Sequence, residues 1–150
     1  MPEQPGFWTE EFDVAELPGG GLLAVYRTND VQNHPRQQNV IAKKGDTWEP
    51  GPVTDAPFPY SGHPEVLATK EGLVMHIATS GTSWTADTGK TWATLEGVPG
   101  SAYYPRSVQL DDGTIMVVGH VGGDDPYGVP DQSIVMDTYT ITVTKNGDQR

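Results

Sequence analysis

The chain has 150 residues, no cysteine, 18 glycines and 13 prolines, and 19% of its residues are charged. It contains no run of about 20 apolar residues, so no membrane span is predicted. A formal charge of −11 disfavours binding to nucleic acid or to an anionic membrane surface, because both require many cations. The lack of cysteine excludes disulfides, thiolate zinc sites and thiol catalysis. No signal peptide is predicted, and the compartment stays undetermined.

Short β-branched and aromatic runs between turn residues predict strands throughout the chain. Three such runs directly follow a glycine: Gly21–Thr28, Leu73–Thr79 and Thr114–His120. A second short run precedes each of these glycines: Asp13–Leu17, Glu65–Ala68 and Arg106–Leu110. Each pair predicts a hairpin, in which Gly20, Gly72 or Gly113 provides the positive φ of the turn.

A third strand is expected after each hairpin, at 39–42, 83–86 and 133–136, and a fourth in the last unit at Thr138–Thr144. Four short strands in each 40–50 residues are typical of β-propeller blades. The sequence therefore predicts an all-β fold of three four-stranded blades, at about 7–55, 56–100 and 101–150. A single β-sandwich with regular strand spacing is the alternative.

The most specific motif is the run Thr85-Ala86-Asp87-Thr88-Gly89-Lys90-Thr91-Trp92. It fits the Ser/Thr-x-Asp-x-Gly-x-x-Trp pattern of the Asp-box, in which Thr85, Asp87, Gly89 and Trp92 are the defining positions. The aspartate is expected to accept backbone N–H groups across a tight turn, while the tryptophan packs beneath it. A weaker copy ends at Trp48 and has Lys43 in place of the aspartate. The motif indicates a structural turn rather than an active site.

These features resemble the sialidase-like, Asp-box (BNR repeat) family of β-propellers. The resemblance extends to Gly62-His63-Pro64-Glu65, to Tyr104-Pro105-Arg106-Ser107 and to the segment at 119–134. Members of that family usually have six blades, so this chain resembles the C-terminal half. An open arc of three blades exposes apolar faces at both ends. We therefore expect a homodimer that completes a six-bladed ring; a fragment of a longer protein is the alternative.

Propeller ligands usually lie at the mouth of the central channel. Alignment of the three hairpins places Asp13, Glu65 and Arg106 at one equivalent position and Arg27, Thr79 and His120 at another. We expect each pair to be neighbours at the open end of its hairpin: Asp13 with Arg27, Glu65 with Thr79, and Arg106 with His120. Further candidates for this substrate-binding rim lie in adjoining loops: His63, Tyr104, Asp124, Asp125 and Tyr127.

The resemblance also implies a chemistry, because sialidases use an arginine triad to bind the substrate carboxylate and a tyrosine nucleophile activated by a glutamate. Tyr104 and Glu65 would take the two catalytic roles, with Arg27 and Arg106 binding substrate. Arg36 is expected in a polar loop, so three clamping arginines are not evident. Asp124 and Asp125 could hold calcium, but the sequence does not assign a metal site or a cofactor.

Two functions remain open at this point. The first is a sialidase-like glycoside hydrolase, or a relic of one, that acts on glycans. The second is a non-catalytic, self-assembling half-propeller, natural or engineered, that binds glycan or protein through its rim.

Overall fold

A computed structural model describes residues 9–28, 35–59, 62–96, 103–121 and 133–142. These residues form strands, turns and irregular segments and contain no helix, so the chain is all-β as predicted. The described residues therefore include no helix that is long and apolar enough to cross a membrane. The strands are β1 (Thr9–Leu17), β2 (Gly21–Thr28), β3 (Pro35–Lys44), β4 (Thr47–Pro50), β5 (Thr54–Pro59), β6 (Glu65–Ala68), β7 (Val74–Ala78), β8 (Gly81–Thr85), β9 (Ala93–Thr94), β10 (Tyr103–Gln109), β11 (Ile115–Val121) and β12 (Ser133–Tyr139).

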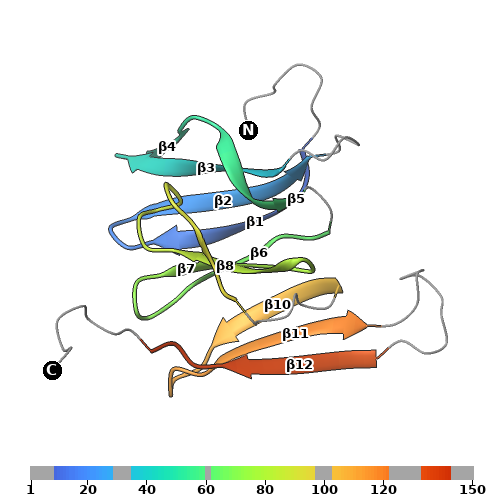
Figure 1. Cartoon of the computed structure of the whole chain (residues 1–150). Helices are drawn as coiled ribbons and strands as arrows, with labels where there is room; N and C mark the ends of the chain where they lie inside the picture. Colours follow the sequence, from blue (N-terminus) through green and yellow to red (C-terminus); the bar gives the residue numbers. More distant parts are fainter. Residues whose placement is uncertain (1–8, 29–34, 60–61, 97–102, 122–132, 143–150) are drawn as a thin grey trace, which may run out of the picture.

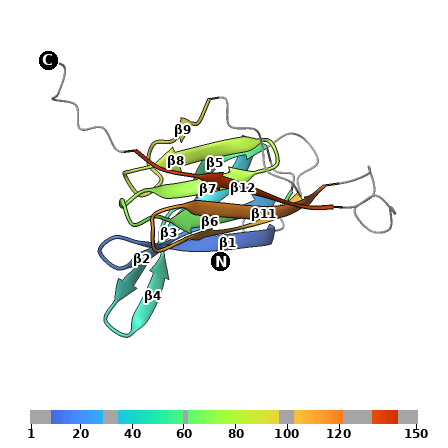
Figure 2. The same cartoon turned by 90° about the horizontal axis from the view of Figure 1, so that it is seen from below.

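The strands form three antiparallel sheets in chain order. Sheet 1 has the order β1-β2-β3-β4, with β5 also paired to β3; sheet 2 has the order β6-β7-β8-β9; and sheet 3 has the order β10-β11-β12. The sheets lie one above another, with sheet 2 between sheets 1 and 3 (Figures 1 and 2). Sheet 2 is thus covered on both faces, which makes every residue of β7 buried.

The three predicted hairpins are confirmed, and their turns have the same geometry. Gly20, Gly72 and Gly113 have φ of 86°, 84° and 89°, a region that side-chain-bearing residues rarely adopt. Each of these glycines donates its N–H to the carbonyl three residues earlier, at 3.1, 3.0 and 3.1 Å. The repeat seen in the sequence is therefore a repeat of backbone conformation.

The predicted fourth strand of the last unit is wrong for residues 138–142, which the structure describes. Thr138 and Tyr139 continue β12, where they lie opposite Met116 and Ile115 of β11. Residues 140–142 carry no strand pairing, and 143–144 lie outside the described residues. The alternation of residue types at 138–144 is typical of a separate strand. However, Thr138 and Tyr139 pair with β11 and therefore belong to the third strand of the unit.

Two apolar clusters lie between the sheets. The first contains residues of sheets 1 and 2: Ala15, Leu17, Leu23, Val25, Ala56, Val66 and Val74, with Val40 and Trp92 packed against them. The second contains residues of sheets 2 and 3: Met75, Ile77, Ile115 and Val117, with Leu67, Trp84, Leu95, Tyr139 and Ile141 packed against them. Because strand side chains alternate between faces, sheet 2 contributes Val74 to one cluster and Met75 to the other.

The Asp-box forms the predicted turn. The Asp87 carboxylate accepts hydrogen bonds from the Thr91 N–H at 2.9 Å and from the Thr91 hydroxyl at 2.6 Å. The Thr85 hydroxyl donates to Asp87 at 2.8 Å and accepts from the Gly89 N–H at 3.0 Å. These hydrogen bonds, with those from Thr91 foremost, lower the pKa of Asp87 to about 2, so the turn keeps its charge at neutral pH.

The Asp-box also connects sheets 1 and 2. Trp92 packs against the first apolar cluster, and its Nε1–H donates to Oε1 of Gln38 in β3 at 3.0 Å. The Gln38 amide donates in turn to the Gly89 carbonyl at 2.6 Å. The weaker copy of the motif differs, because Trp48 in the β3–β4 hairpin remains 49% exposed. The tryptophan of the complete motif therefore packs against a neighbouring sheet.

We predict that Thr85→Val destabilises the fold by about 1–3 kcal/mol, because it leaves the buried Gly89 N–H without its acceptor while conserving side-chain shape. Thr47→Val is the matched control, since Thr47 is exposed and bonds only within the β3–β4 turn in the described contacts. Urea unfolding monitored by circular dichroism would measure both variants. Equal midpoints for the two would contradict a stabilising role for the Thr85 hydroxyl.

Candidate functional site

Two carboxylates, one on the first strand of sheet 1 and one on the first strand of sheet 2, connect each of these sheets to the next. Oδ2 of Asp13 in β1 accepts the N–H of Val66 in β6 at 2.8 Å. Oε1 of Glu65 in β6 accepts the N–H of Ser107 in β10 at 2.5 Å and its hydroxyl at 2.6 Å. Asp13 and Glu65 occupy the equivalent positions predicted from the hairpin alignment. The same hydrogen bond, from a backbone N–H of the following sheet to a carboxylate, is thus made twice.

Arg106 occupies the third equivalent position and reverses the charge. Its Nη1 donates to Oε2 of Glu65 at 2.9 Å, with 66% of the Arg106 side chain exposed and 5% of the Glu65 side chain exposed. Burial raises the pKa of Glu65 above its ordinary value, against the opposing effect of the bonds from Ser107 and Arg106, and the nearby charge of Asp13 raises it further. Glu65 is therefore a structural acceptor whose two oxygens are both engaged.

A row of four aromatic rings lies beside this ion pair, and we call it the tyrosine–histidine cluster: His63, Tyr103, Tyr104 and His120. The rings of Tyr104 and His120 are stacked at 5.9 Å between centroids, and those of Tyr103 and His120 at 5.7 Å. His63 contacts the Tyr104 ring at 5.9 Å in a tilted arrangement. The structure thus brings together three predicted rim residues, His63, Tyr104 and His120, and adds Tyr103.

Tyr104 has an unusual backbone. Its φ of 48° lies in the left-handed region, which is uncommon for a residue with a bulky side chain. The pairing of β10 with β11 shifts register between Tyr103 and Arg106, and such bulges redirect side chains near functional sites. Both tyrosines are exposed, Tyr103 at 41% and Tyr104 at 43%. The irregular start of β10 therefore presents two tyrosine rings to solvent.

Arg36 is the main residue that the sequence interpretation missed. It was expected in a polar loop, but it belongs to β3 and is completely buried. Nη1 of Arg36 donates to Nε2 of His76 at 3.0 Å, and Nη2 donates to the Gly62 carbonyl at 2.9 Å. Arg36 thereby fixes the loop that carries His63. The polar residues around Arg36 hide its burial, because an inward-facing arginine leaves no apolar pattern.

His76 extends this buried network to Glu65. Because arginine can only donate, Nε2 of His76 accepts from Arg36, so the proton is assigned to Nδ1, which points at the Glu65 carbonyl at 3.3 Å. Burial first, and the Arg36 charge second, lower the pKa of His76 to about 3. Burial also lowers the pKa of Arg36, to about 10, so the pair is a neutral histidine beside a charged arginine at pH 7. His76 therefore serves packing and hydrogen bonding inside the fold.

The predicted neighbour pairs at the hairpin ends are wrong. The turn places Leu17 opposite Gly21, and this register puts Asp13 opposite Val25 rather than beside Arg27. Arg27 instead forms salt bridges with Glu10 at 2.8 Å and Glu11 at 3.2 Å.

The predicted pairs in the other two hairpins are displaced in the same way. Glu65 lies opposite Ile77 rather than Thr79. Arg106 lies opposite Val118, while His120 lies opposite Tyr103. The turn fixes the register of each hairpin. In each hairpin, the residue that lies opposite comes two positions earlier in the second strand than the predicted neighbour.

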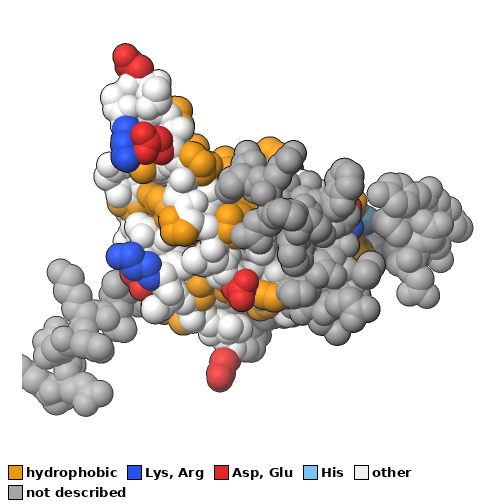
Figure 3. Space-filling model, turned by 90° about the horizontal axis from the view of Figure 1, so that it is seen from above, with side chains coloured by type: hydrophobic (Ala, Val, Ile, Leu, Met, Phe, Trp, Pro, Cys, Tyr) orange, Lys and Arg blue, Asp and Glu red, His pale blue; other side chains and the backbone are white. Residues whose placement is uncertain are grey.

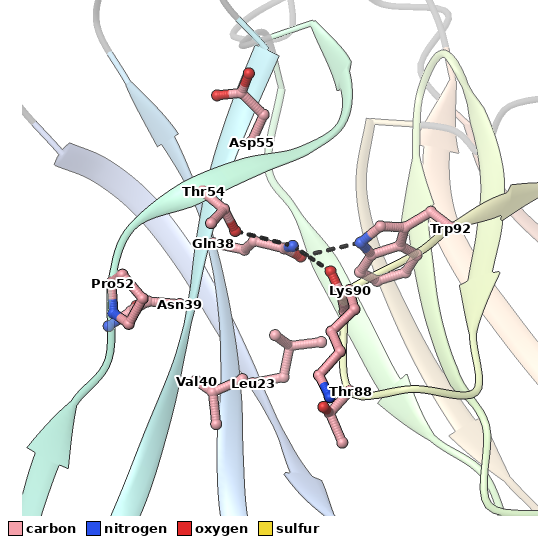
Figure 4. Close-up of a pocket in the computed structure, with 11 residues that line it drawn as sticks. Leu23, Gln38, Asn39, Val40, Pro52, Thr54, Asp55, Thr88, Lys90 and Trp92 are labelled. Carbon is pink, nitrogen blue, oxygen red and sulfur yellow. Dashed lines mark hydrogen bonds between the residues drawn. The ribbon is translucent and has the colours of Figure 1, made fainter.

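A cleft of about 390 Å³ lies elsewhere, between β3, β5 and the Asp-box turn (Figure 4). Gln38 crosses it, bonded to Thr54 on one side and to Trp92 and Gly89 on the other. Lys90 and Asp55 add one cation and one anion to its lining. No predicted rim residue lines this cleft, so it is separate from the tyrosine–histidine cluster.

Asp124, Asp125 and Tyr127 lie outside the described residues. Within the described ranges, no group of three or more histidine, aspartate and glutamate side chains could hold a metal ion. Comparison of the chain with protein-family models, with curated proteins and with solved structures gave no match.

We predict that His76→Gln removes part of the acid sensitivity of the fold. Glutamine can still accept from Arg36 and donate to a carbonyl. Wild-type His76 is neutral when folded down to pH about 3 but takes up a proton near pH 6.5 when unfolded. The unfolded state therefore binds more protons between these values, and the wild-type free energy of unfolding falls as pH decreases, by up to about 1.4 kcal/mol per pH unit.

Urea unfolding of both proteins between pH 4.5 and 7.5 tests this. The stability advantage of the wild type should shrink, or reverse, as the pH falls below 6.5. Contributions from Glu65 and other shared groups cancel in the difference. A difference that is constant over the whole range would contradict a buried neutral His76.

Proposed function

We propose that the chain forms three blades of a sialidase-like β-propeller and that its tyrosine–histidine cluster, with Arg106, binds a carbohydrate without hydrolysing it. Three antiparallel sheets in chain order, each with its first strand next to that of the following sheet, support the blade arrangement: β6 contacts β1 on one side and β10 on the other. The Asp-box turn between sheets 1 and 2 supports the family resemblance.

Carbohydrate binding is proposed chiefly because the tyrosine–histidine cluster, with two exposed tyrosines, lies beside the partly exposed guanidinium of Arg106. Tyr103 and Tyr104 present amphipathic rings to solvent, and such rings contribute contact area together with a polar group. The buried Nδ1 atoms of His63 and His120 have no hydrogen-bond partner among the described residues. Because buried polar atoms are normally satisfied, we propose that a sugar hydroxyl reaching past the exposed tyrosine rings is the partner of these two nitrogens.

Arg106 would extend recognition to an acidic sugar. It is anchored through Nη1 to Glu65, while two thirds of its side chain remain exposed. An arginine held in this way can bind a carboxylate with charge-assisted hydrogen bonds. Arg27 and Arg36 are less suited to this role, since Arg27 is paired with two glutamates and Arg36 is buried.

The engagement of Glu65 argues against hydrolysis through the Tyr104 and Glu65 pair. Both Glu65 oxygens accept bonds from β10, from Ser107 and Arg106. A general base needs a carboxylate oxygen directed at the proton that it removes. One observation favours a hydrolase as second candidate: the left-handed backbone of Tyr104, because strained conformations gather at active sites.

We predict that the protein binds the methyl α-glycoside of sialic acid more tightly than methyl β-galactoside, and that Arg106→Ala removes this preference, with roughly a tenfold loss of affinity for the acidic ligand. Lys70→Ala is the matched control, because Lys70 is an exposed cation in the turn at the other end of the β6–β7 hairpin. Ligand-observed NMR titration would measure the dissociation constants. Absence of binding to either sugar at millimolar concentration contradicts the proposal.

We further predict that the wild type does not turn over a fluorogenic sialoside at high protein concentration. The Tyr104→Phe variant separates the two candidates, because it removes a nucleophilic hydroxyl but keeps the ring that would contact a sugar. Turnover by the wild type that is lost in Tyr104→Phe would establish the hydrolase and contradict the non-catalytic proposal.

A further inference from the structure

The two outer sheet faces of the arc carry exposed apolar side chains, although Ala24 and Tyr26 on the outer face of sheet 1 are buried. On sheet 1, the face turned away from sheet 2 carries Phe12 at 55% and Val14 at 41% exposure. On sheet 3, the face turned away from sheet 2 carries the exposed side chains of Val108 (49%), Leu110 (37%), Ile134 (75%) and Met136 (57%). On the side of the molecule where β3 and β4 lie, Figure 3 shows several groups of hydrophobic side chains within the described surface, with few charged ones between them. Faces of this kind mark interaction surfaces.

The hydrogen bonds that repeat between successive sheets indicate which contact each outer face would make with a further sheet. We call the residue at the equivalent inner-strand position the edge residue: Asp13, Glu65 and Arg106. The edge residue always faces the following sheet, since Asp13 bonds to Val66 and Glu65 bonds to Ser107, and Val66 and Ser107 each come directly after an edge residue. Arg106 starts from the face of sheet 3 that is turned away from sheet 2, as its pairing with Val118 shows, while its Nη1 reaches back to Glu65.

We propose that a second copy of this chain covers that face, so that sheet 3 of each copy packs on sheet 1 of the other and two copies form a closed two-fold ring. The charges of the edge residues carry this inference. Within the chain, neighbouring edge residues are Asp13 beside Glu65, whose carboxylates repel each other, and then Glu65 paired with Arg106. At the junction between copies, Arg106 would meet Asp13 of the second copy, which is an attractive pair.

The apolar residues match at the same register. In the first junction, Ala15, two residues after the edge residue, and Val66, one residue after the next edge residue, share the first apolar cluster. In the second junction, Leu67 and Ser107 hold the equivalent positions, and Leu67 packs against the cluster that contains Val117, the partner of Ser107 in β11. The same rule places Val108 of one copy against Val14 of the other. A two-fold axis repeats this junction and leaves no outer face uncovered.

Closure would also complete the candidate site. Arg106 would lie between Glu65 of its own chain and Asp13 of the second copy, so each carbohydrate site would include residues of both chains. This inference rests on the blade arrangement proposed above but not on carbohydrate binding. It can therefore be tested without any sugar.

The test is the mass in solution, measured by sedimentation velocity and by light scattering after size exclusion. The wild type should have twice the chain mass of 16.2 kDa. Val108→Glu and Val14→Lys should each be monomeric, because each places a charge opposite an apolar side chain in both junctions. The double variant Val108→Glu/Val14→Lys should recover the dimer, because the two charges then face each other. Both positions are exposed in the single chain, so neither change buries a charge in the monomer.

Thr47→Glu is the matched control. Thr47 is exposed, but it lies opposite Lys44 on the other face of sheet 1, and this variant should stay dimeric. Circular dichroism checks that all variants keep their strands. A monomeric wild type overturns the proposal and assigns the faces to another polypeptide, and masses above two copies overturn the closed ring. Monomeric single variants without recovery in the double variant overturn the proposed register.

Discussion

The structure depends on one constraint: its sheets are apolar on two faces and must be covered on both. Sheet 2 meets this requirement within the chain, because Val66 and Val74 pack toward sheet 1 while Met75 and Ile77 pack toward sheet 3. On sheets 1 and 3, apolar side chains of the face turned away from sheet 2 remain exposed, among them Val14 and Val108. The stacking order, the exposed residues at both ends and the case for a second copy all follow from this difference.

Polar contacts between the first strands of the three sheets fix how the sheets are stacked. Apolar packing alone tolerates sliding of one sheet on another, whereas a hydrogen bond from a particular backbone N–H to a carboxylate fixes one register. Asp13 and Glu65 make this bond between successive sheets, and Gln38 makes a comparable link farther out through Trp92 and Gly89. Sheets 1 and 2 are thus linked at two places, at their first strands and through Gln38, whereas sheets 2 and 3 are linked through Glu65.

Buried polar groups connect this scaffold to the candidate site. Arg36 spans from β3 to His76 and to the carbonyl of Gly62, so sheet 1 sets the position of the loop that presents His63. His76 in turn contacts the carbonyl of Glu65. Because a buried arginine with a neutral histidine has few alternative partners, this network makes the placement of the site a consequence of sheet packing.

The sequence alone determined what is local. Glycines at 20, 72 and 113 specified the hairpins, and the spacing of Thr85, Asp87, Gly89 and Trp92 specified the Asp-box turn, because these structures form between residues a few positions apart. Only the tertiary structure decided what depends on contacts between distant segments. The bond from Arg106 to Glu65, the burial of Arg36 against His76 and the stacking of Tyr104 on His120 join residues of different strands. Hydrophobic periodicity carries no signal for such polar contacts, since the partner of a charged side chain is set by how sheets pack.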